Sequence, residues 1–281
     1  MEEGFFEGVP RIHWQAHAVQ GARAAVVVVH GYGEHAGRYL ELVRRLGDAG
    51  LSCYLADLRG HGLSEGARGH ATGFDDYLSD LERVVAMARE ASDRVFLLGH
   101  SMGGLLVLRL LLRDGAFEGA ILSAPYLRLG FSPSRWKLVL GRVLARIAPR
   151  LRIPSGLRHE MLTRDAERLA RVKADPLCFT TTTAGWYFAA NAAQEEVLAR
   201  AAEIRVPLLV LLPTADPVAD PRATEEFFAR LGSEDRRLLR YEGALHEVFN
   251  EIPEVREAAL DAVRDWILER LGGQVVRADA T

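Results

Sequence analysis

The chain has 281 residues and a formal net charge of −3, with 49% apolar and 26% charged residues. This length can bury a full core as one large or two small α/β domains, and the charge gives no argument for a nucleic-acid partner. The N-terminus MEEGFFEGVPRIHW lacks the basic and apolar regions of a secretory signal, and no apolar run is long enough to span a bilayer, so the expected location is cytoplasmic.

Short apolar runs alternate with amphipathic stretches through the first part of the chain. The run AAVVVV at 24–29 is apolar throughout, which is typical of a central strand buried on both faces. Helical spacing of apolar residues is found around 39–46, over 75–91 and after residue 101. Further strands are predicted at 12–18, 51–56, 95–98 and 119–123. This alternation predicts an α/β fold, a mostly parallel sheet with helices on both faces.

The alternation stops after Pro125 and resumes with a strand at 206–212, a helix from Pro221, a strand at 237–241 and a helix over 255–271. The intervening segment has its own charge balance. From Leu127 to Arg200 there are thirteen Lys and Arg against six Asp and Glu. A segment this different from its surroundings is expected to be an insertion. The predicted organisation is a core in two parts, 1–126 and 201–281, with a helical insertion at 127–200.

The sequence GHSMG at 99–103 fits the pattern G-x-S-x-G between a predicted strand and a predicted helix. So sharp a reversal strains its middle residue, and glycines two positions before and after avoid collisions. The turn exposes the hydroxyl of Ser101 at a helix N-terminus, where developing negative charge is favoured. Ser101 is therefore the predicted nucleophile.

A serine nucleophile needs a base and an acid that orients the base. His246 follows the strand that ends at Tyr241, and Asp216 follows the strand at 206–212, so both emerge at the carboxyl edge of the sheet. Asp220 is a second candidate acid, but it precedes Pro221 at a helix start, where an N-cap role is expected.

The backbone N–H groups of Met102 and Tyr32 are the predicted oxyanion donors, because Met102 follows the nucleophile and Tyr32 lies in the glycine-rich turn after 24–29. The same turn, GYGEHAG at 31–37, superficially resembles a dinucleotide-binding loop. Its last glycine is one residue late, and Glu34 would occupy the place of the pyrophosphate. Neither a metal cluster nor a phosphate loop is found, and Cys53 and Cys178 match no metal or redox spacing, so they are expected to be reduced, buried thiols.

Five blocks in order, HGYGEHAGRY, DLRGHGLSEGARGH, FDDYLSDL, GHSMGG and LHEVFNE, resemble the monoacylglycerol lipase and lysophospholipase branch of the α/β-hydrolases. The resemblance implies a serine esterase of α/β-hydrolase fold with Ser101, Asp216 and His246 as its triad. It also implies that 127–200 form a helical lid and that Glu34 lies near the polar end of a glycerol ester. Tyr32 departs from the family, where this position is often small, and is expected to narrow the entrance.

The insertion contains an apolar stripe at helical spacing. One interpretation is a lid helix that packs this stripe on the body and leaves a basic face in water. The other is a helix lying on an anionic membrane surface as a peripheral contact. The stripe consists of Trp136, Val139, Leu140, Val143, Leu144 and Ile147, and the basic residues around it are Arg135, Lys137, Arg142, Arg146 and Arg150.

The function expected from the sequence is hydrolysis of lipid-like esters, above all monoacylglycerols, through an acyl-enzyme and without metal or cofactor. Lysophospholipid hydrolysis and acyl transfer, or cleavage of an amide or thioester, would use the same triad. Outside the enzymes, the alternative is a ligand-binding or scaffold protein on an inactive hydrolase fold.

Overall fold

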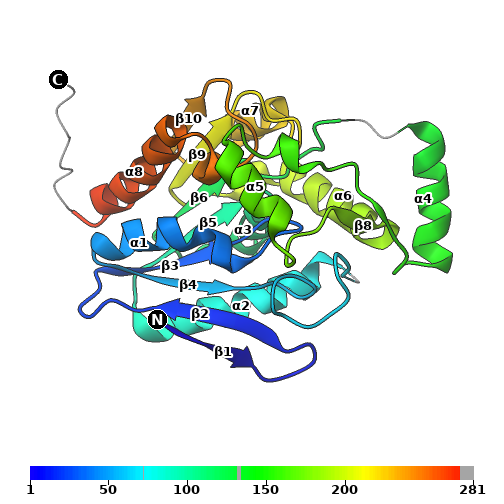
Figure 1. Cartoon of the computed structure of the whole chain (residues 1–281). Helices are drawn as coiled ribbons and strands as arrows, with labels where there is room; N and C mark the ends of the chain where they lie inside the picture. Colours follow the sequence, from blue (N-terminus) through cyan, green and yellow to red (C-terminus); the bar gives the residue numbers. More distant parts are fainter. Residues whose placement is uncertain (72, 132–133, 273–281) are drawn as a thin grey trace.

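The computed structural model describes residues 1–71, 73–131 and 134–272. Its central feature is an 8-stranded sheet in the order β1-β2-β4-β3-β5-β6-β9-β10 (Figure 1). Strand β2 pairs antiparallel with β1 on one side and with β4 on the other, and the other pairings are parallel. The strands are β1 Glu2–Phe6, β2 Ile12–His17, β3 Ala24–Val29, β4 Leu51–Ala56, β5 Val95–His100, β6 Gly119–Ser123, β9 Leu208–Pro213 and β10 Arg236–Tyr241.

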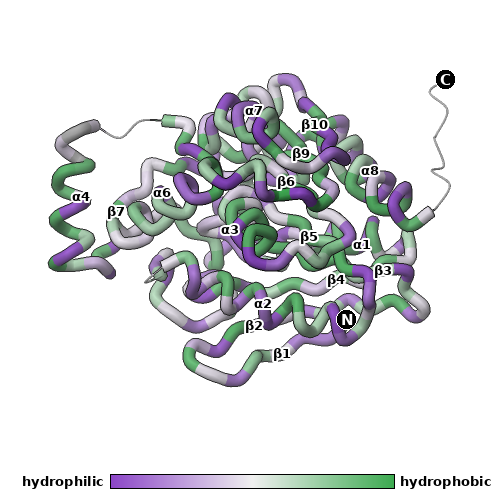
Figure 2. Tube along the Cα trace, turned by 180° about the vertical axis from the view of Figure 1, so that it is seen from behind, coloured by the Kyte–Doolittle hydropathy of each residue, from purple (hydrophilic) through white to green (hydrophobic). Residues whose placement is uncertain are grey.

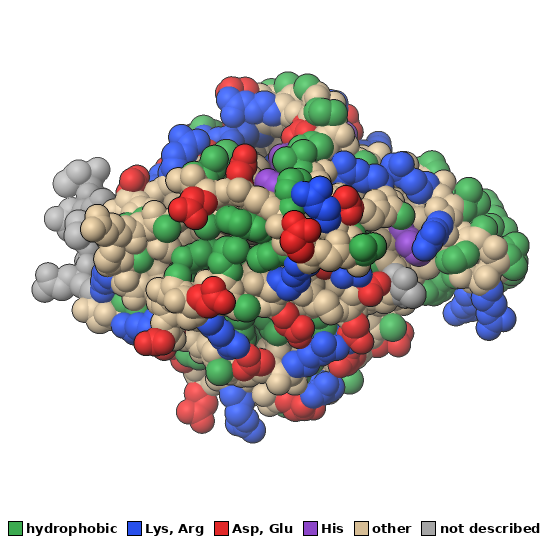
Figure 3. Space-filling view, turned by 90° about the horizontal axis from the view of Figure 1, so that it is seen from below, with side chains coloured by type: hydrophobic (Ala, Val, Ile, Leu, Met, Phe, Trp, Pro, Cys, Tyr) green, Lys and Arg blue, Asp and Glu red, His purple; other side chains and the backbone are tan. Residues whose placement is uncertain are grey.

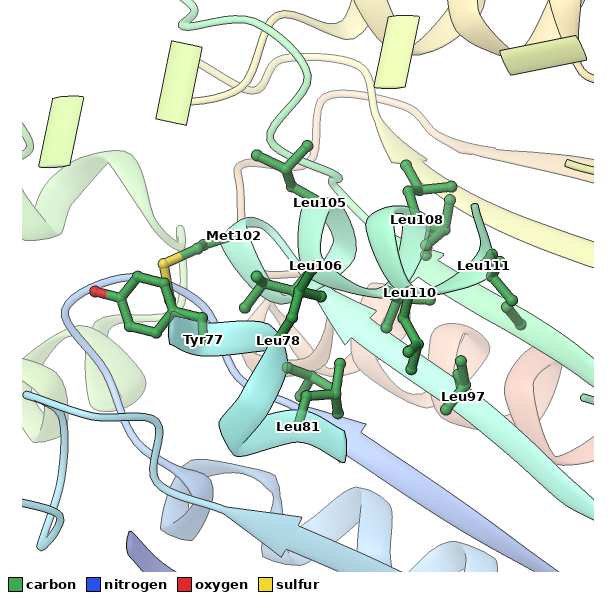
Figure 4. Packing of buried hydrophobic residues seen from close by; sticks show 14 of the residues in the cluster. Tyr77, Leu78, Leu81, Leu97, Met102, Leu105, Leu106, Leu108, Leu110 and Leu111 are labelled. Carbon is green, nitrogen blue, oxygen red and sulfur yellow. The ribbon is translucent and has the colours of Figure 1, made fainter. Parts of the chain in front are cut away.

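Helices cover both faces of the sheet. Alternate residues of β3 belong to two separate cores, since Val26 packs with α1 and α8 and Val27 packs with α2 and α3. Figure 4 shows the second core, where Leu78 and Leu81 of α2 approach Leu106 of α3. The predicted two-sided burial of this strand is therefore observed. The helices of the body are α1 Leu40–Asp48, α2 Phe74–Ala91, α3 Met102–Leu111, α7 Pro221–Arg230 and α8 Pro253–Arg270.

Between β6 and β9 the chain leaves the sheet, and we call residues 124–207 the β6–β9 connection. It holds α4 Arg135–Ile147, β7 Arg152–Pro154, α5 Ala166–Ala174, β8 Thr181–Thr183 and α6 Ala184–Ala199, and β7 pairs antiparallel with β8. Figure 1 places α4 at the outer end of this connection, with α6 and β8 between it and the sheet.

The apolar stripe of α4 faces solvent. Trp136 is 65% exposed and Ile147 is 74% exposed, and Val139, Leu140 and Val143 are exposed as well. The opposite face of α4 turns inward, where an added Cβ at Gly141 would meet the Phe188 ring at 3.5 Å. Green side chains gather at this end of the molecule with Lys and Arg beside them (Figure 3), and apolar and polar residues alternate along α4 (Figure 2). The interpretation in which the stripe packs on the body is therefore wrong, because the stripe is exposed and the opposite face of α4, at Gly141, makes the inward contact.

Candidate active site

Ser101 occupies a strained turn between β5 and α3. Its φ of 52° and ψ of −117° lie in a region that a residue with a side chain rarely adopts. A Cβ at Gly99 would lie 2.4 Å from the Gly103 carbonyl oxygen, and one at Gly103 would lie 2.2 Å from the Val29 oxygen. Both glycines are thus required by close backbone approach, as the G-x-S-x-G spacing predicts. The serine lies in the wall of a cavity of about 580 Å³.

His246 and Asp216 meet at the same edge of the sheet. His246 Nδ1 lies 2.7 Å from Asp216 Oδ2. The other oxygen of Asp216 accepts hydrogen bonds from the backbone of Val218 at 2.7 Å and of Ala219 at 3.1 Å. Because an ionised carboxylate can only accept, Nδ1 carries the hydrogen and Nε2 keeps a lone pair that can take a proton.

The charge state of His246 is set by two opposed effects. Burial alone would lower the pKa of His246, but the Asp216 carboxylate beside it raises the pKa above its ordinary value. In the neighbouring His100, Nδ1 lies 3.1 Å from a hydroxyl, that of Ser123, instead of a carboxylate. The His100 ring lies 4.8 Å from the His246 ring, and burial together with His246 lowers the pKa of His100 to about 4. The His246 imidazole is therefore the stronger base of the two.

The structure brings Ser101 and His246 to one cavity wall, with Met102 and Tyr32 beside them. In the described part of the chain, the backbone N–H groups of Met102 and Tyr32 donate to no protein acceptor, so both can receive a ligand oxygen. The Met102 side chain lies against the Tyr77 ring in the core between α2 and α3 (Figure 4). Asp220, the alternative acid, lies elsewhere: it caps α7 by accepting from the Arg222 N–H at 3.0 Å.

Glu34 also lines the cavity, within a buried ionic network. Its Oε1 accepts from the Gly31 N–H and the Tyr39 hydroxyl, both at 2.6 Å, and its Oε2 accepts from Arg38 at 2.9 Å. Arg38 also donates to both carboxylate oxygens of Glu247, the residue after His246. Burial alone would raise the pKa of Glu34, but Arg38 and the nearby histidines lower it to about 2. The network ties the turn at 31–35 to the loop that carries His246.

Sequence reasoning missed Arg38 and Glu247. The available signals were the four-residue spacing of Glu34 and Arg38 and the position of Glu247 directly after the predicted base. Their pairing joins residues 209 positions apart, which no local pattern reveals.

His35, Asp175 and Cys178 form a cluster that the sequence spacing of Cys178 did not suggest. Ligand-type atoms of His35, Asp175 and Cys178 fall within 4.8 Å of one another. Both imidazole nitrogens of His35 are already engaged, Nε2 with Asp175 at 2.8 Å and Nδ1 with the Gly37 N–H at 3.2 Å. Burial raises the pKa of the Cys178 thiol to about 12, so it stays protonated at neutral pH. These contacts suit a hydrogen-bonded pair better than a metal site. Cys178 is only partly buried, unlike Cys53.

Most of the chain is similar in sequence and structure to known hydrolases. A family model described as "Serine aminopeptidase, S33" matches residues 20–253. Monoacylglycerol lipase of Mycolicibacterium smegmatis is 36% identical over 255 residues, covering 89% of each protein. Phospholipase YtpA of Bacillus subtilis is 32% identical, covering 86% of this chain and 93% of its own. The crystal structure of Paleococcus ferrophilus monoacylglycerol lipase has a TM-score of 0.85 at 31% identity and covers 92% of this chain and 99% of its own.

Proposed function

Because this chain belongs to the serine hydrolase family described as serine aminopeptidase, S33, within the α/β-hydrolases, we propose that it hydrolyses monoacylglycerols and related lipid esters. The observation that carries the proposal is the meeting of Ser101 and the His246–Asp216 pair at one largely apolar cavity. Two of its relatives, 36% and 32% identical, are named as a monoacylglycerol lipase and a phospholipase, which supports a lipid ester as substrate.

The proposed reaction is a two-step acyl transfer to water. His246 Nε2 takes the hydroxyl proton of Ser101 while Oγ forms a bond to the acyl carbon, and the Tyr32 and Met102 N–H groups hold the resulting oxyanion. Collapse breaks the bond to the alcohol, which leaves with the proton from His246. Water then attacks the acyl carbon while His246 takes a proton from the water; collapse breaks the bond to Ser101 Oγ, which receives that proton from His246, and the fatty acid leaves. The steps balance without metal or cofactor.

We also propose that residues 127–200 form a cap over the site and hold the acyl chain. This segment supplies much of the apolar lining of the cavity. The alcohol end of the substrate would then lie by the Glu34–Arg38 network, the polar part of the lining. Among the apolar side chains that the segment contributes are Leu129, Phe131, Leu138, Ile153, Tyr187 and Phe188.

A substrate panel tests the proposal. We expect measurable hydrolysis of a monoacylglycerol, with kcat/KM rising from short to medium acyl chains as more apolar surface is buried, by about tenfold for every two methylenes that enter the cavity. The panel comprises p-nitrophenyl esters from acetate to palmitate, a monoacylglycerol and a lysophospholipid. A fluorophosphonate probe should label Ser101 in the wild type.

Three results would contradict parts of this proposal. Preference for the lysophospholipid would assign the phospholipid head group instead of glycerol. Acyl transfer to an added alcohol in preference to water would identify an acyltransferase. Absence of both labelling and turnover would favour a binding protein on a hydrolase fold.

We further propose that α4 rests on an anionic membrane surface as a peripheral contact. Its exposed apolar stripe is flanked by Arg142 and Arg146, both exposed, while Arg135 and Lys137 have side chains outside the described set. Apolar residues bordered by arginines fit the boundary between lipid tails and anionic head groups. None of the described helices is long and apolar enough to cross a bilayer.

Vesicle sedimentation measures this contact. Reversing both charges, Arg142→Glu with Arg146→Glu, should weaken binding to anionic vesicles more than tenfold, since each basic residue near such a surface contributes on the order of 1 kcal/mol. Added salt should weaken wild-type binding in the same direction. Arg222→Glu, an exposed charge reversal on α7, serves as the matched control. Equal sedimentation of the wild type, the double variant and the Arg222→Glu control would contradict a membrane contact through α4.

A further inference from the structure

The Tyr32 side chain links its own turn, residues 31–35, to the β6–β9 connection. Its hydroxyl lies 3.0 Å from the Gly69 carbonyl oxygen and 2.9 Å from that of Thr181 in β8, and it shares its one hydrogen between these two acceptors. The ring lies 4.0 Å from the Trp186 ring and 5.5 Å from that of Phe179, both in the connection. The sequence predicts that Tyr32 narrows the cavity entrance, and in the structure two backbone carbonyls hold its hydroxyl in place.

The backbone is built around this hydroxyl. A Cβ at Gly69, whose φ is +64°, would lie 2.3 Å from the Tyr32 hydroxyl oxygen. Next to Tyr32, the Gly33 carbonyl accepts from the Phe179 N–H at 2.9 Å, and a Cβ at Gly33 would lie 2.3 Å from the Phe179 oxygen. Gly33 thus lets the turn at 31–35 approach the chain at 179–186, and Gly69, from a third segment, leaves room for the Tyr32 hydroxyl beside the Thr181 oxygen.

We propose that the Tyr32 side chain is a positioning residue that orients its own backbone N–H toward the oxyanion. This inference rests on the proposed hydrolysis. A side chain held at both ends restricts rotation of the peptide unit that carries this N–H. An oxyanion donor stabilises the transition state only when its N–H points at the developing charge, so a small displacement of the N–H lowers the reaction rate markedly. A shift of residues 179–186 would therefore change the reaction rate as well as access to the cavity.

The direct test is Tyr32→Phe, which removes the hydroxyl and keeps the ring. We expect kcat to fall roughly tenfold and KM to change little. This is a smaller loss than the one caused by removing an oxyanion donor altogether. A trifluoromethyl ketone, which mimics the tetrahedral intermediate, should bind weaker by the same factor. Tyr241→Phe, at the end of β10, is the matched loss of a tyrosine hydroxyl outside the site.

A merely structural role would lower the melting temperature and leave kcat and inhibitor affinity unchanged below it, which would overturn the proposal. A role in narrowing the entrance would change KM according to acyl length, and that result would overturn it too.

Gly69→Ala gives an independent variant that retains Tyr32, should Tyr32→Phe fold poorly. It displaces the Tyr32 hydroxyl, so kcat should fall by a similar factor. The double variant should then be no slower than the slower single variant, because both act on one contact. If the fall in kcat of the double variant equals the product of the two single falls, the two residues do not act through one contact and the proposal is contradicted.

The proposed hydrolysis and this inference can fail separately. If wild-type protein neither reacts with a fluorophosphonate nor turns over ester, the proposed function is wrong. If wild-type protein does both and Tyr32→Phe has the same kcat and ketone affinity, only the inference is wrong.

Discussion

Ser101→Ala and His246→Ala should each lower kcat for a p-nitrophenyl ester by about 10⁶-fold, with little change in KM. Alanine at 101 leaves no atom to form the acyl-enzyme, and alanine at 246 leaves the hydroxyl without a base. Residues that act as one unit are strongly non-additive, so the double variant should be no slower than either single variant. The residual rate over water would come from the oxyanion donors and from substrate binding. Single-turnover kinetics with purified variants measures all three.

Ser52→Ala is the control for loss of a buried serine. Its hydroxyl accepts from the Val19 N–H at 3.0 Å, so its removal should cost about 1 kcal/mol of folding free energy and leave kcat unchanged. Ser101→Ala should keep the wild-type melting temperature or exceed it, because a strained active-site residue contributes little to stability. Ser101→Ala activity above one hundredth of wild type would show that the nucleophile lies elsewhere.

The central strands were predictable because burial on both faces leaves an unbroken apolar run. The predicted limits of β3, β4 and β6 agree with the structure, and the predicted α/β-hydrolase fold is confirmed. Strand β1 was not predicted: it reads EEGFF, lies at the sheet edge and is mostly exposed. An edge strand paired on one side needs no apolar pattern, so its sequence is free of the signal that marks a core strand.

The turn around Ser101 was predictable because its requirement is local: two glycines at fixed spacing avoid two backbone collisions. The Arg38–Glu247 pair was not, since it depends on how distant loops meet. On α4, periodicity identified the apolar stripe but not its direction. Leu138 and Gly141, outside that stripe, line the cavity instead, and Gly141 lies against the Phe188 ring of α6.

Asp216→Asn should lower kcat about 10⁴-fold at neutral pH and also shift the pH profile. The amide can donate a hydrogen to Nδ1, which favours the tautomer whose Nε2 carries a hydrogen and cannot accept the proton of Ser101. In the wild type, Asp216 raises the pKa of His246, so kcat/KM should fall as pH decreases through a value above that of an ordinary imidazole. Without the carboxylate this acid limb should move to lower pH. Initial rates across pH 4 to 9 measure both effects.

Asp220→Asn provides the matched control, because this neighbouring carboxylate caps α7 and pairs with Arg128 at 2.9 Å. Asparagine still caps a helix, so the variant should lose less than about 1 kcal/mol of stability and keep both kcat and the acid limb. The reverse outcome, with Asp220→Asn inactive and Asp216→Asn active, would mean that Asp220 orients the base in solution. Since Asp216 lies 2.7 Å from His246 Nδ1 and has two backbone donors on its other oxygen, that outcome would require the loop at 214–220 to refold.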